Sequence, residues 1–336
     1  MIPVANSRRQ SETWQQTLRE AIRSSSTLLE RLGLADHPLA RQLDDGAHFS
    51  TLVPEPFLRR MRRQDPDDPL LLQVLATRQE RDSIPGFSMD PLTEANYLRA
   101  PGLLQKYAGR ALLIAATTCA VNCRYCFRRH FPYTEHQGAQ VLPDPVLSAL
   151  AADSSIHEVI LSGGDPLMLR DGTLRSLIER LGEIPNLKTL RIHTRLPVVI
   201  PERVTDGLVE ILAAARLRSI VVLHINHPAE IDDELGAALT RLRSSGAILL
   251  NQSVLLRRVN DHADILVELS ERLIEYGVLP YYLHLLDPVA GAAHFNVSRT
   301  EAFEFVKDVR ARLPGYLVPR LVQEIPGATS KTEVIG

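Results

Sequence analysis

Cysteine and lysine are scarce in this sequence, which has three cysteines and four lysines among 336 residues. The three cysteines lie within eight positions, so they are odd in number and too crowded for a disulfide framework. An excess of one charge is also lacking, because 38 basic and 40 acidic residues leave a formal charge of −2. Composition therefore gives no electrostatic reason to expect a nucleic-acid or membrane-surface partner.

Long hydrophobic runs are absent as well. No stretch approaches the ~20 apolar residues needed to cross a bilayer, and the first ten residues lack the apolar core of a signal peptide. We therefore expect a soluble, cytoplasmic protein. A chain of this length can bury roughly 75% of its unfolded surface, which favours one large α/β domain, alone or with a small appendage.

Apolar, β-branched runs alternate with helical stretches from residue 111 onward. One helical stretch carries leucine or isoleucine at i, i+3, i+4 and i+7, which predicts a helix able to cover a pair of parallel strands; these are Leu174, Leu177, Ile178 and Leu181. Nearly continuous apolar strands are typical of a parallel sheet wrapped by helices. The pattern predicts six βα units, with strands at 111–118, 158–163, 189–194, 219–226, 247–255 and 279–287.

The predicted fold class is therefore α/β, a partial (βα)6 barrel. Residues 1–110 form a helical N-terminal region, 111–321 form the barrel, and 322–336 form a C-terminal segment that closes its mouth. Because the carboxyl ends of parallel strands meet at one rim, polar residues at these ends should gather in a single mouth. They are Cys119 after the first strand, Ser162, Gly163, Gly164 and Asp165 after the second, His224 after the fourth, Gln252 in the fifth, and His284 and Asp287 at the end of the sixth.

The cysteine triad has the spacing Cys-x3-Cys-x2-Cys, from Cys119 through Cys123 to Cys126. Cubane iron–sulfur clusters ordinarily take four thiolates. The sequence has no fourth cysteine, so a 4Fe–4S cluster here would keep one iron open for an external chelate. A structural zinc ion is the alternative, and it would need a distant histidine or carboxylate as its fourth ligand.

This spacing, with Tyr125 directly before the last cysteine, resembles the signature of the radical S-adenosylmethionine (SAM) superfamily. The resemblance implies a radical SAM barrel in which SAM chelates the open iron and an external electron donor converts it to a 5′-deoxyadenosyl radical. It implies that Tyr125 lies near the adenine and that the glycine-rich turn contacts the SAM amino group, through Ser162, Gly163, Gly164 and Asp165. His224 and Gln252 are further candidate SAM contacts, although a histidine at a strand end often has a structural role.

Five longer stretches together resemble the lysine 2,3-aminomutase family: 123–130, 191–201, 224–228, 251–257 and 280–284. The resemblance runs from about residue 65 to residue 332 and is strongest to a shorter branch, whose members make (R)-β-lysine for attachment to elongation factor P. It implies an isomerase that converts L-lysine to β-lysine, functionally linked to elongation factor P and its ligase. It also implies pyridoxal 5′-phosphate as a second coenzyme.

The family carries this coenzyme on a lysine. Lys307 lies in a helical stretch and Lys188 precedes the third strand at the opposite end of the barrel, so neither is well placed. Lys331 falls in the tail where the family has its catalytic coenzyme lysine. The family's phosphate-binding region is matched by Lys106, Tyr107 and Arg110, where cations suit a phosphate dianion. Solvated surface side chains are the alternative interpretation of both groups.

Substrate recognition follows from the same resemblance. Arg128 corresponds to the arginine that pairs with the amino acid's carboxylate, and Asp287 and Glu324 correspond to the two acidic residues that hold the distant ammonium of lysine. Glu324 replaces the aspartate of the free-lysine enzymes, and His284 replaces their tyrosine near the coenzyme.

Two other hypotheses remain open: a radical SAM enzyme without pyridoxal phosphate that acts on a peptide or nucleotide, and a non-catalytic metal-stabilised binding module.

Overall fold

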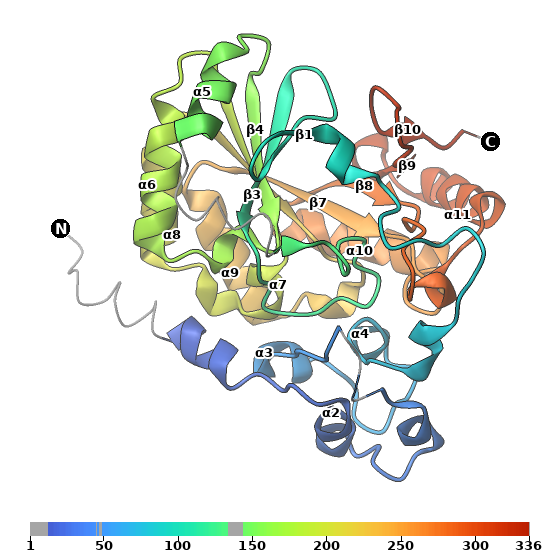
Figure 1. Ribbon diagram of the computed structural model, residues 1–336. Coiled ribbons are helices and arrows are strands. Elements are labelled where there is room, and N and C mark those ends of the chain that lie inside the picture. The colour runs from blue at the N-terminus through green and yellow to red at the C-terminus, as the bar shows by residue number, and fades with distance from the viewer. Residues whose placement is uncertain (1–12, 45, 47–48, 134–143, 336) are drawn as a thin grey trace.

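The computed structural model describes residues 13–44, 46, 49–133 and 144–335, so the first ten residues, examined for a signal peptide, lie outside it. One sheet forms the centre of this part of the chain (Figure 1). Its strands, in spatial as in chain order, are β1 (Leu98–Ala100), β2 (Leu103–Leu104), β3 (Arg110–Ala116), β4 (Glu158–Gly163), β5 (Thr189–Thr194), β6 (Arg218–Leu223), β7 (Ile248–Val254), β8 (Leu279–His284), β9 (Arg320–Gln323) and β10 (Thr332–Glu333).

The predicted α/β fold class is confirmed, since β3 to β8 fall within three residues of the six predicted strands and pair in parallel. Strand β9 was not predicted and adds a seventh parallel strand. Strands β1, β2 and β10 pair in antiparallel fashion at the two edges. The division of the chain at residues 110 and 321 stays a prediction, and two of the strands precede the first of these boundaries.

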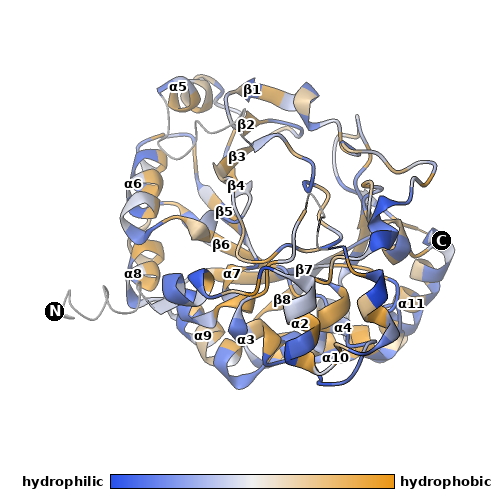
Figure 2. Cartoon of the chain, turned by 60° about the horizontal axis from the view of Figure 1, so that its bottom comes forward, coloured by the Kyte–Doolittle hydropathy of each residue, from blue (hydrophilic) through white to orange (hydrophobic). Residues whose placement is uncertain are grey.

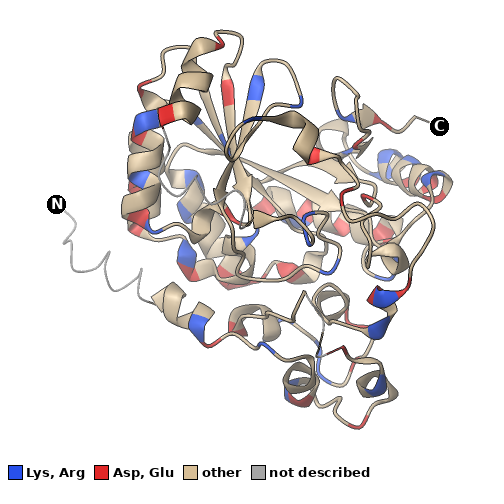
Figure 3. Cartoon of the chain, in the orientation of Figure 1, with Lys and Arg blue, Asp and Glu red and all other residues tan. Residues whose placement is uncertain are grey.

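The longer helices pack on the outside of the curved sheet (Figure 2). Leu174, Leu177, Ile178 and Leu181 are buried in one of them as predicted, in the same apolar cluster as Leu190 of β5. Acidic and basic residues are interspersed along these outer helices (Figure 3). Within the described ranges, residues 13–19 are helical, and the other helices of more than one turn are α2 (Ser25–Leu32), α5 (Asp144–Ala152), α6 (Asp171–Gly182), α8 (Asp206–Ala214), α9 (Asp233–Ser244), α10 (Ala263–Glu275) and α11 (Arg299–Arg312).

Single turns of helix occupy the N-terminal region and the loops at the strand ends. The α-helical turns are α3 (Glu55–Leu58), α4 (Pro69–Leu72) and α7 (Leu196–Val199). The 3₁₀ turns are η1 (Pro38–Gln42), η2 (Arg78–Arg81), η3 (Glu94–Tyr97), η5 (Pro166–Met168), η6 (Pro201–Arg203), η7 (Pro228–Glu230), η8 (Ala293–Phe295) and η9 (Gly315–Leu317). None of the helices in the described ranges is long and apolar enough to cross a membrane.

Burial alternates along strands β5 and β7. In β5, Leu190 and Ile192 are fully buried toward the helices, whereas Arg191 and His193 between them are partly exposed. The same alternation holds in β7, where Gln252 is partly exposed between buried neighbours. These strands are therefore apolar mainly on the helix side, and their concave face carries polar side chains. The sequence pattern predicted strands that are apolar on both faces. Strands β5 and β7 are less continuously apolar because the inner face of this parallel sheet is partly open.

The barrel is incomplete, because β1 and β10 are edge strands that do not pair with each other. Side chains join the two edges instead. Lys106 and Tyr107, which follow β2, both donate hydrogen bonds to Glu324, which follows β9. The backbone N–H of Gly327 donates to the hydroxyl of Tyr97 at 2.9 Å. We call this pair of contacts the seam of the barrel.

Buried Arg195, directly after β5, connects the N-terminal region to the strand ends. Its Nη2 donates to Gln73 Oε1 at 2.8 Å and to Glu230 Oε2 at 2.9 Å. Its Nη1 donates to Cys123 Sγ at 2.9 Å and to the hydroxyl of Tyr125. One guanidinium thus fixes the helical region, the end of β6 and the cysteine loop relative to one another.

Replacing Arg195 by methionine should destabilise the fold strongly. The change leaves the fully buried Glu230 carboxylate without its cation, which costs about 3–5 kcal/mol. Arg31→Met is the matched control, because Arg31 and its partner Glu55 are both about half exposed and such pairs contribute at most about 1 kcal/mol. The two variants are compared by urea unfolding, and equal shifts in midpoint would contradict this account of Arg195.

Candidate functional site

The cysteine loop begins directly after β3 and holds Cys119, Cys123 and Cys126 as free, partly buried thiols. Burial raises the pKa of the Cys126 thiol to about 11 and that of Cys119 well above its usual value. Within the described ranges, no three His, Cys, Asp or Glu side chains converge closely enough to hold a single metal ion. Zinc draws its four ligands to about 2.3 Å from one point, whereas a cubane cluster spreads its thiolates over different irons. Three thiols from one loop, with no fourth cysteine in the sequence, are the donor set of a cubane cluster that keeps one iron open.

Two glycines let the loop after β4 pack directly against the cysteine loop. A Cβ atom on Gly163 would lie 2.4 Å from the carbonyl oxygen of Ala116, and one on Gly164 would lie 2.3 Å from that of Thr118. Gly163 also has φ +116°, a conformation that side chains disfavour. The N–H of Gly164 donates to Ala116 O at 2.7 Å, and that of Asp165 to Thr118 O at 2.9 Å. The glycines thus fix the backbone that leads into Cys119.

The carboxylate of Asp165 is buried and engaged within the chain. It accepts a hydrogen bond from the Thr194 hydroxyl at 2.7 Å and from the backbone N–H groups of Arg195 at 2.7 Å and Leu196 at 2.8 Å. It also caps η5 through the N–H of Leu167. These contacts tie the end of β4 to the end of β5. The predicted contact of Asp165 with the SAM amino group stays a prediction, beside this structural role.

Tyr125, within the cysteine loop, contacts the N-terminal region, because its hydroxyl lies 3.4 Å from Gln73 Oε1. Its hydroxyl accepts a hydrogen bond from Asn226 Nδ2 at 2.6 Å as well as from Arg195. Its ring packs edge-on against Phe295 with centroids 6.2 Å apart. Burial raises the pKa of this phenol, so it is neutral at physiological pH.

Three histidines, His193 in β5, His224 directly after β6 and His284 at the end of β8, line the inner face of the sheet. The Nε2 atom of His224 lies 2.8 Å from Nε2 of Gln252, so the two residues predicted to contact SAM form a hydrogen bond with each other. Burial lowers the pKa of His193, His224 and His284, and the charge of Lys331 lowers all three further, so the imidazoles are neutral. The Nε2 atoms of His193 and His284 are buried and have no hydrogen-bond partner among the described residues. These two orphaned atoms are suited to a polar ligand.

Glu324 is the centre of a charged cluster near the C-terminus. Lys331 Nζ donates to its Oε1 at 2.5 Å, and Lys106 Nζ donates to its Oε2 at 2.7 Å, beside the Tyr107 hydroxyl. Burial opposes ionisation, but the charge of Lys331 and these hydrogen bonds lower the pKa of Glu324 to about 2. Arg110 stacks on the Tyr107 ring at 4.6 Å and makes no ion pair within the described ranges. The cluster brings together every residue predicted for the pyridoxal phosphate site.

Asp287, after β8, is the second acidic residue predicted to bind the substrate ammonium. Its carboxylate has no hydrogen-bond or ion-pair partner among the described residues. Burial raises the pKa of this carboxyl to about 7, although the charge of Lys331 opposes the shift. A buried carboxyl group with a pKa near neutral pH gains from a cation beside it, and a bound ligand can supply that cation.

Arg128, two residues after the triad, is buried and already paired. Its Nε and Nη2 donate to the two carboxylate oxygens of Glu94 at 2.8 and 2.6 Å, and its Nη1 donates to Ser162 Oγ at 2.9 Å. The expected pairing with a substrate carboxylate stays a prediction, and any such carboxylate must share this guanidinium with Glu94. Glu94 was missed from the sequence, because it lies in a polar stretch without periodicity.

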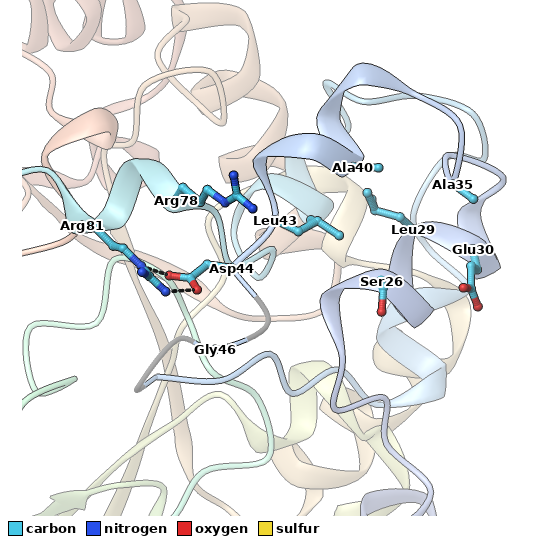
Figure 4. Close-up of a pocket in the computed structure, with 10 residues that line it drawn as sticks. All are labelled: Ser26, Leu29, Glu30, Ala35, Ala40, Leu43, Asp44, Gly46, Arg78 and Arg81. Atoms are coloured by element: carbon cyan, nitrogen blue, oxygen red, sulfur yellow. Dashed lines mark hydrogen bonds and ion pairs between the residues drawn. The ribbon is translucent and has the colours of Figure 1, made fainter.

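A hollow of about 750 Å³ lies in the N-terminal region, and its lining includes none of the predicted site residues (Figure 4). Asp44 and Arg81 at its rim form a two-pronged ion pair, with N–O distances of 2.6 and 2.5 Å. The hollow is therefore separate from the cluster of titratable groups at the strand ends.

Comparison with known proteins agrees with this geometry. The family profile described as the Radical SAM superfamily matches residues 113–284, from β3 to the end of β8. An L-lysine 2,3-aminomutase from Haemophilus influenzae is 48% identical over 324 residues, which cover 96% of each chain. One from Escherichia coli is 48% identical over 322 residues, which cover 96% of this chain and 94% of that protein.

The chain belongs to the L-lysine 2,3-aminomutase family. A longer member from Clostridium subterminale is 35% identical over 83% of this chain, which spans 67% of that protein. Membership of this family makes the chain a radical SAM enzyme and an isomerase, with a 4Fe–4S cluster and SAM as cofactors. The two hypotheses that the sequence left open were a radical SAM enzyme without pyridoxal phosphate that acts on a peptide or nucleotide, and a non-catalytic metal-stabilised binding module. Both are less consistent with this membership, as is a structural zinc ion at the triad.

Replacing Gly164 by alanine should disrupt the cysteine loop. The added Cβ atom would meet the Thr118 backbone at 2.3 Å, and its three nearest neighbours are all backbone atoms of Thr118, which cannot move aside as a flexible side chain could. We expect a lower melting temperature and at least a twofold loss of iron bound after anaerobic reconstitution. Gly172→Ala, at a helical glycine with nothing within 4 Å of the new Cβ, should retain full iron content. Equal iron content in both variants would contradict the packing role of Gly164.

Proposed function

We propose that this chain converts L-lysine to β-lysine, using a SAM-derived radical and pyridoxal 5′-phosphate, and that the product is (R)-β-lysine for modification of elongation factor P. The activity is the one named for the relatives from Haemophilus influenzae and Escherichia coli. The observation that carries the proposal is the cluster at the barrel mouth, where Lys331 contacts Glu324 and lies near Asp287. We further infer that this reaction takes place in the cytoplasm.

The proposed cofactor residues follow from the chemistry of the donors. Cys119, Cys123 and Cys126 would hold the cluster, and Tyr125, His224 and Gln252, with the turn from Ser162 to Asp165, would surround SAM. When bound, the cluster and SAM supply a carbon-centred radical, and pyridoxal phosphate supplies an electron-delocalising carrier for the migrating amino group.

The pyridoxal phosphate would be held at the seam. Lys331 is the proposed covalent lysine, since Lys188 is exposed and Lys307 lies on the outer helix α11 in an exposed pair with Glu304. Lys106, Tyr107 and Arg110 are the proposed phosphate contacts, and Arg110 brings a cation that no carboxylate neutralises within the described ranges. The orphaned Nε2 atoms of His193 and His284 are available to the polar substituents of its ring.

The proposed substrate contacts match the charge distribution of lysine. Arg128, near the triad, takes the α-carboxylate, and the acidic pair takes the distant ammonium. Glu324 is fully ionised and bound to the Lys331 ammonium, so a substrate ammonium can replace Lys331 on Oε1 when that lysine is engaged elsewhere. Asp287 then gains the cation that it lacks. Two carboxylates at this position select a chain with a terminal amine over leucine or alanine.

Mutation of Lys331 tests the function and the coenzyme site together. The anaerobically reconstituted protein, given reductant, SAM, pyridoxal phosphate and L-lysine, should yield β-lysine, and Lys331→Ala should lose the activity by at least about a thousandfold. Borohydride reduction of the wild type should place the coenzyme's mass on the peptide that contains Lys331. Lys307→Ala is the control and should be fully active. A label on Lys106, or no β-lysine from the wild type, would refute the proposal.

The KM for L-lysine should depend on pH through Asp287. Its carboxyl has a pKa of about 7 in the folded protein, so the anion that attracts the substrate ammonium is lost as pH falls through 7. We expect the KM to rise about tenfold from pH 8 to pH 6, because about a tenth of the carboxyl is ionised at pH 6. Glu324 stays ionised over this range and adds no pH dependence. Asp287→Asn should show a high KM at both pH values, and a persistent slope in that variant would exclude Asp287.

A further inference from the structure

The turn η3 crosses from the N-terminal region to β1 and touches both ends of the candidate site. It is a single 3₁₀ turn from Glu94 to Tyr97. A 3₁₀ helix has about three residues per turn, so the side chains at its first and fourth positions lie on the same face. Glu94 and Tyr97 therefore point in the same direction, although their contacts belong to different parts of the barrel.

Glu94 forms the first contact, with the guanidinium of Arg128. Both side chains are largely buried, with 14% and 5% of their surface exposed, and both carboxylate oxygens accept from the same edge of the guanidinium. Together with the bond from Nη1 to Ser162, this pairing holds the guanidinium from more than one side. The outer edge between Nη1 and Nη2 still carries N–H donors for a second carboxylate.

Tyr97 forms the second contact, with the loop between β9 and β10 that carries Lys331. Its hydroxyl accepts the N–H of Gly327 at 2.9 Å, and Gly327 has φ +81°, as the turn of this loop requires. The Tyr97 ring also lies 5.8 Å from Lys106 Nζ, which binds Glu324. One residue of η3 is thus attached to the acidic and coenzyme end of the site.

Other contacts anchor η3 itself. The strand-like bridge between Ser88 and Val289 joins the preceding segment to the loop after β8, with hydrogen bonds of 2.9 and 2.8 Å. Thr93, directly before the turn, has φ +50°, which is uncommon for a β-branched residue. The chain keeps this strained conformation where it allows Glu94 and Tyr97 to make both contacts.

We propose that η3 is a clamp that fixes the distance between Arg128 and the Lys331 loop, and so determines which length of amino acid fits between them. Glu94 and Tyr97 are positioning residues in this clamp. The inference rests on the proposed function, in which the α-carboxylate binds Arg128 and the distant ammonium binds Glu324 and Asp287. It assigns length selection to a turn that contacts neither ammonium-binding carboxylate.

Glu94→Gln tests the carboxylate end of the clamp. The neutral amide holds Arg128 less firmly, so the KM for L-lysine should rise about tenfold with kcat within twofold of the wild type. Cadaverine, which is lysine without its carboxylate, should inhibit the variant and the wild type equally. Glu304→Gln, at an exposed glutamate of α11, is the matched control and should change neither constant. A lower KM would show that Glu94 competes with the substrate, and this result would overturn the proposal.

Tyr97→Phe tests the other end. Loss of the hydroxyl frees Gly327, so the preference for L-lysine over the shorter L-ornithine, measured as the ratio of kcat/KM values, should fall about tenfold. Tyr316→Phe is the matched control, since Tyr316 is 65% exposed, and should keep the wild-type preference. The same preference is measured in Glu94→Gln and in the double variant. The loss of preference in the double variant should be smaller than the product of the losses in the two single variants, because a clamp released at one end no longer fixes the other. Strictly multiplicative losses would contradict one shared clamp.

Hydrogen exchange separates failure of the clamp from failure of the proposed function. Exchange at residues 325–331 should rise about tenfold in Glu94→Gln as well as in Tyr97→Phe, and should not rise in the two control variants. This measurement needs no turnover. If the wild type makes no β-lysine but exchange responds in this way, the clamp stands and the proposed function fails. If exchange at 325–331 is unchanged in Glu94→Gln, the clamp fails, whatever the activity.

Discussion

The buried charge of Arg195 is the constraint on which the site depends. A guanidinium removed from water needs partners in place of the lost hydration, and here Glu230, Gln73, Tyr125 and Cys123 bind its two terminal nitrogens. These partners come from the N-terminal region, the cysteine loop and the segment after β6. The requirement to satisfy one charge therefore brings three separate parts of the chain to the same rim of the sheet.

The seam solves a related problem at the opposite side of the barrel. An open sheet leaves its edge strands free to separate, yet the candidate site needs residues from both edges. Glu324 joins them by accepting hydrogen bonds from Lys106 and Tyr107, and η3 joins the same two edges through Tyr97 and Gly327. The edges are thus joined by side chains that also belong to the site, so structure and proposed chemistry share the same groups.

Most of the fold could be predicted because its signal is local. Each of the six main strands is a short run rich in apolar residues, and the helix from Asp171 to Gly182 shows its apolar face at the helical period. Strand β9 escaped prediction because its four residues, Arg320–Gln323, are too few to show a period and become a strand only by pairing with β8. Strands β1 and β2 were missed for the same reason.

The site could be predicted only where a motif carries the chemistry. The cysteine spacing and the position of Lys331 are visible in the sequence, and the cluster around Glu324 brings together Lys106, Tyr107 and Lys331. The pairing of Arg128 with Glu94 could not be predicted, because it joins residues 34 positions apart through a non-repetitive segment. The carboxylate of Asp165 was expected to be free for a ligand, and only the fold shows that backbone N–H groups surround it.

The order of the strands in the sheet also decides where this enzyme could accept new sequence. Lys331 and the cysteine loop are linked through consecutive hydrogen-bonded strand pairs from β3 to β9. The distance between them is therefore set by the spacing of paired strands and not by flexible loops. A one-residue insertion inside any of these strands would turn its inner side chains outward, and His193 or His284 would exchange places with an apolar neighbour. Loops at the amino ends of the strands, such as the exposed turn at Gly246, lie outside this constraint. Domain fusions and affinity tags are best placed there.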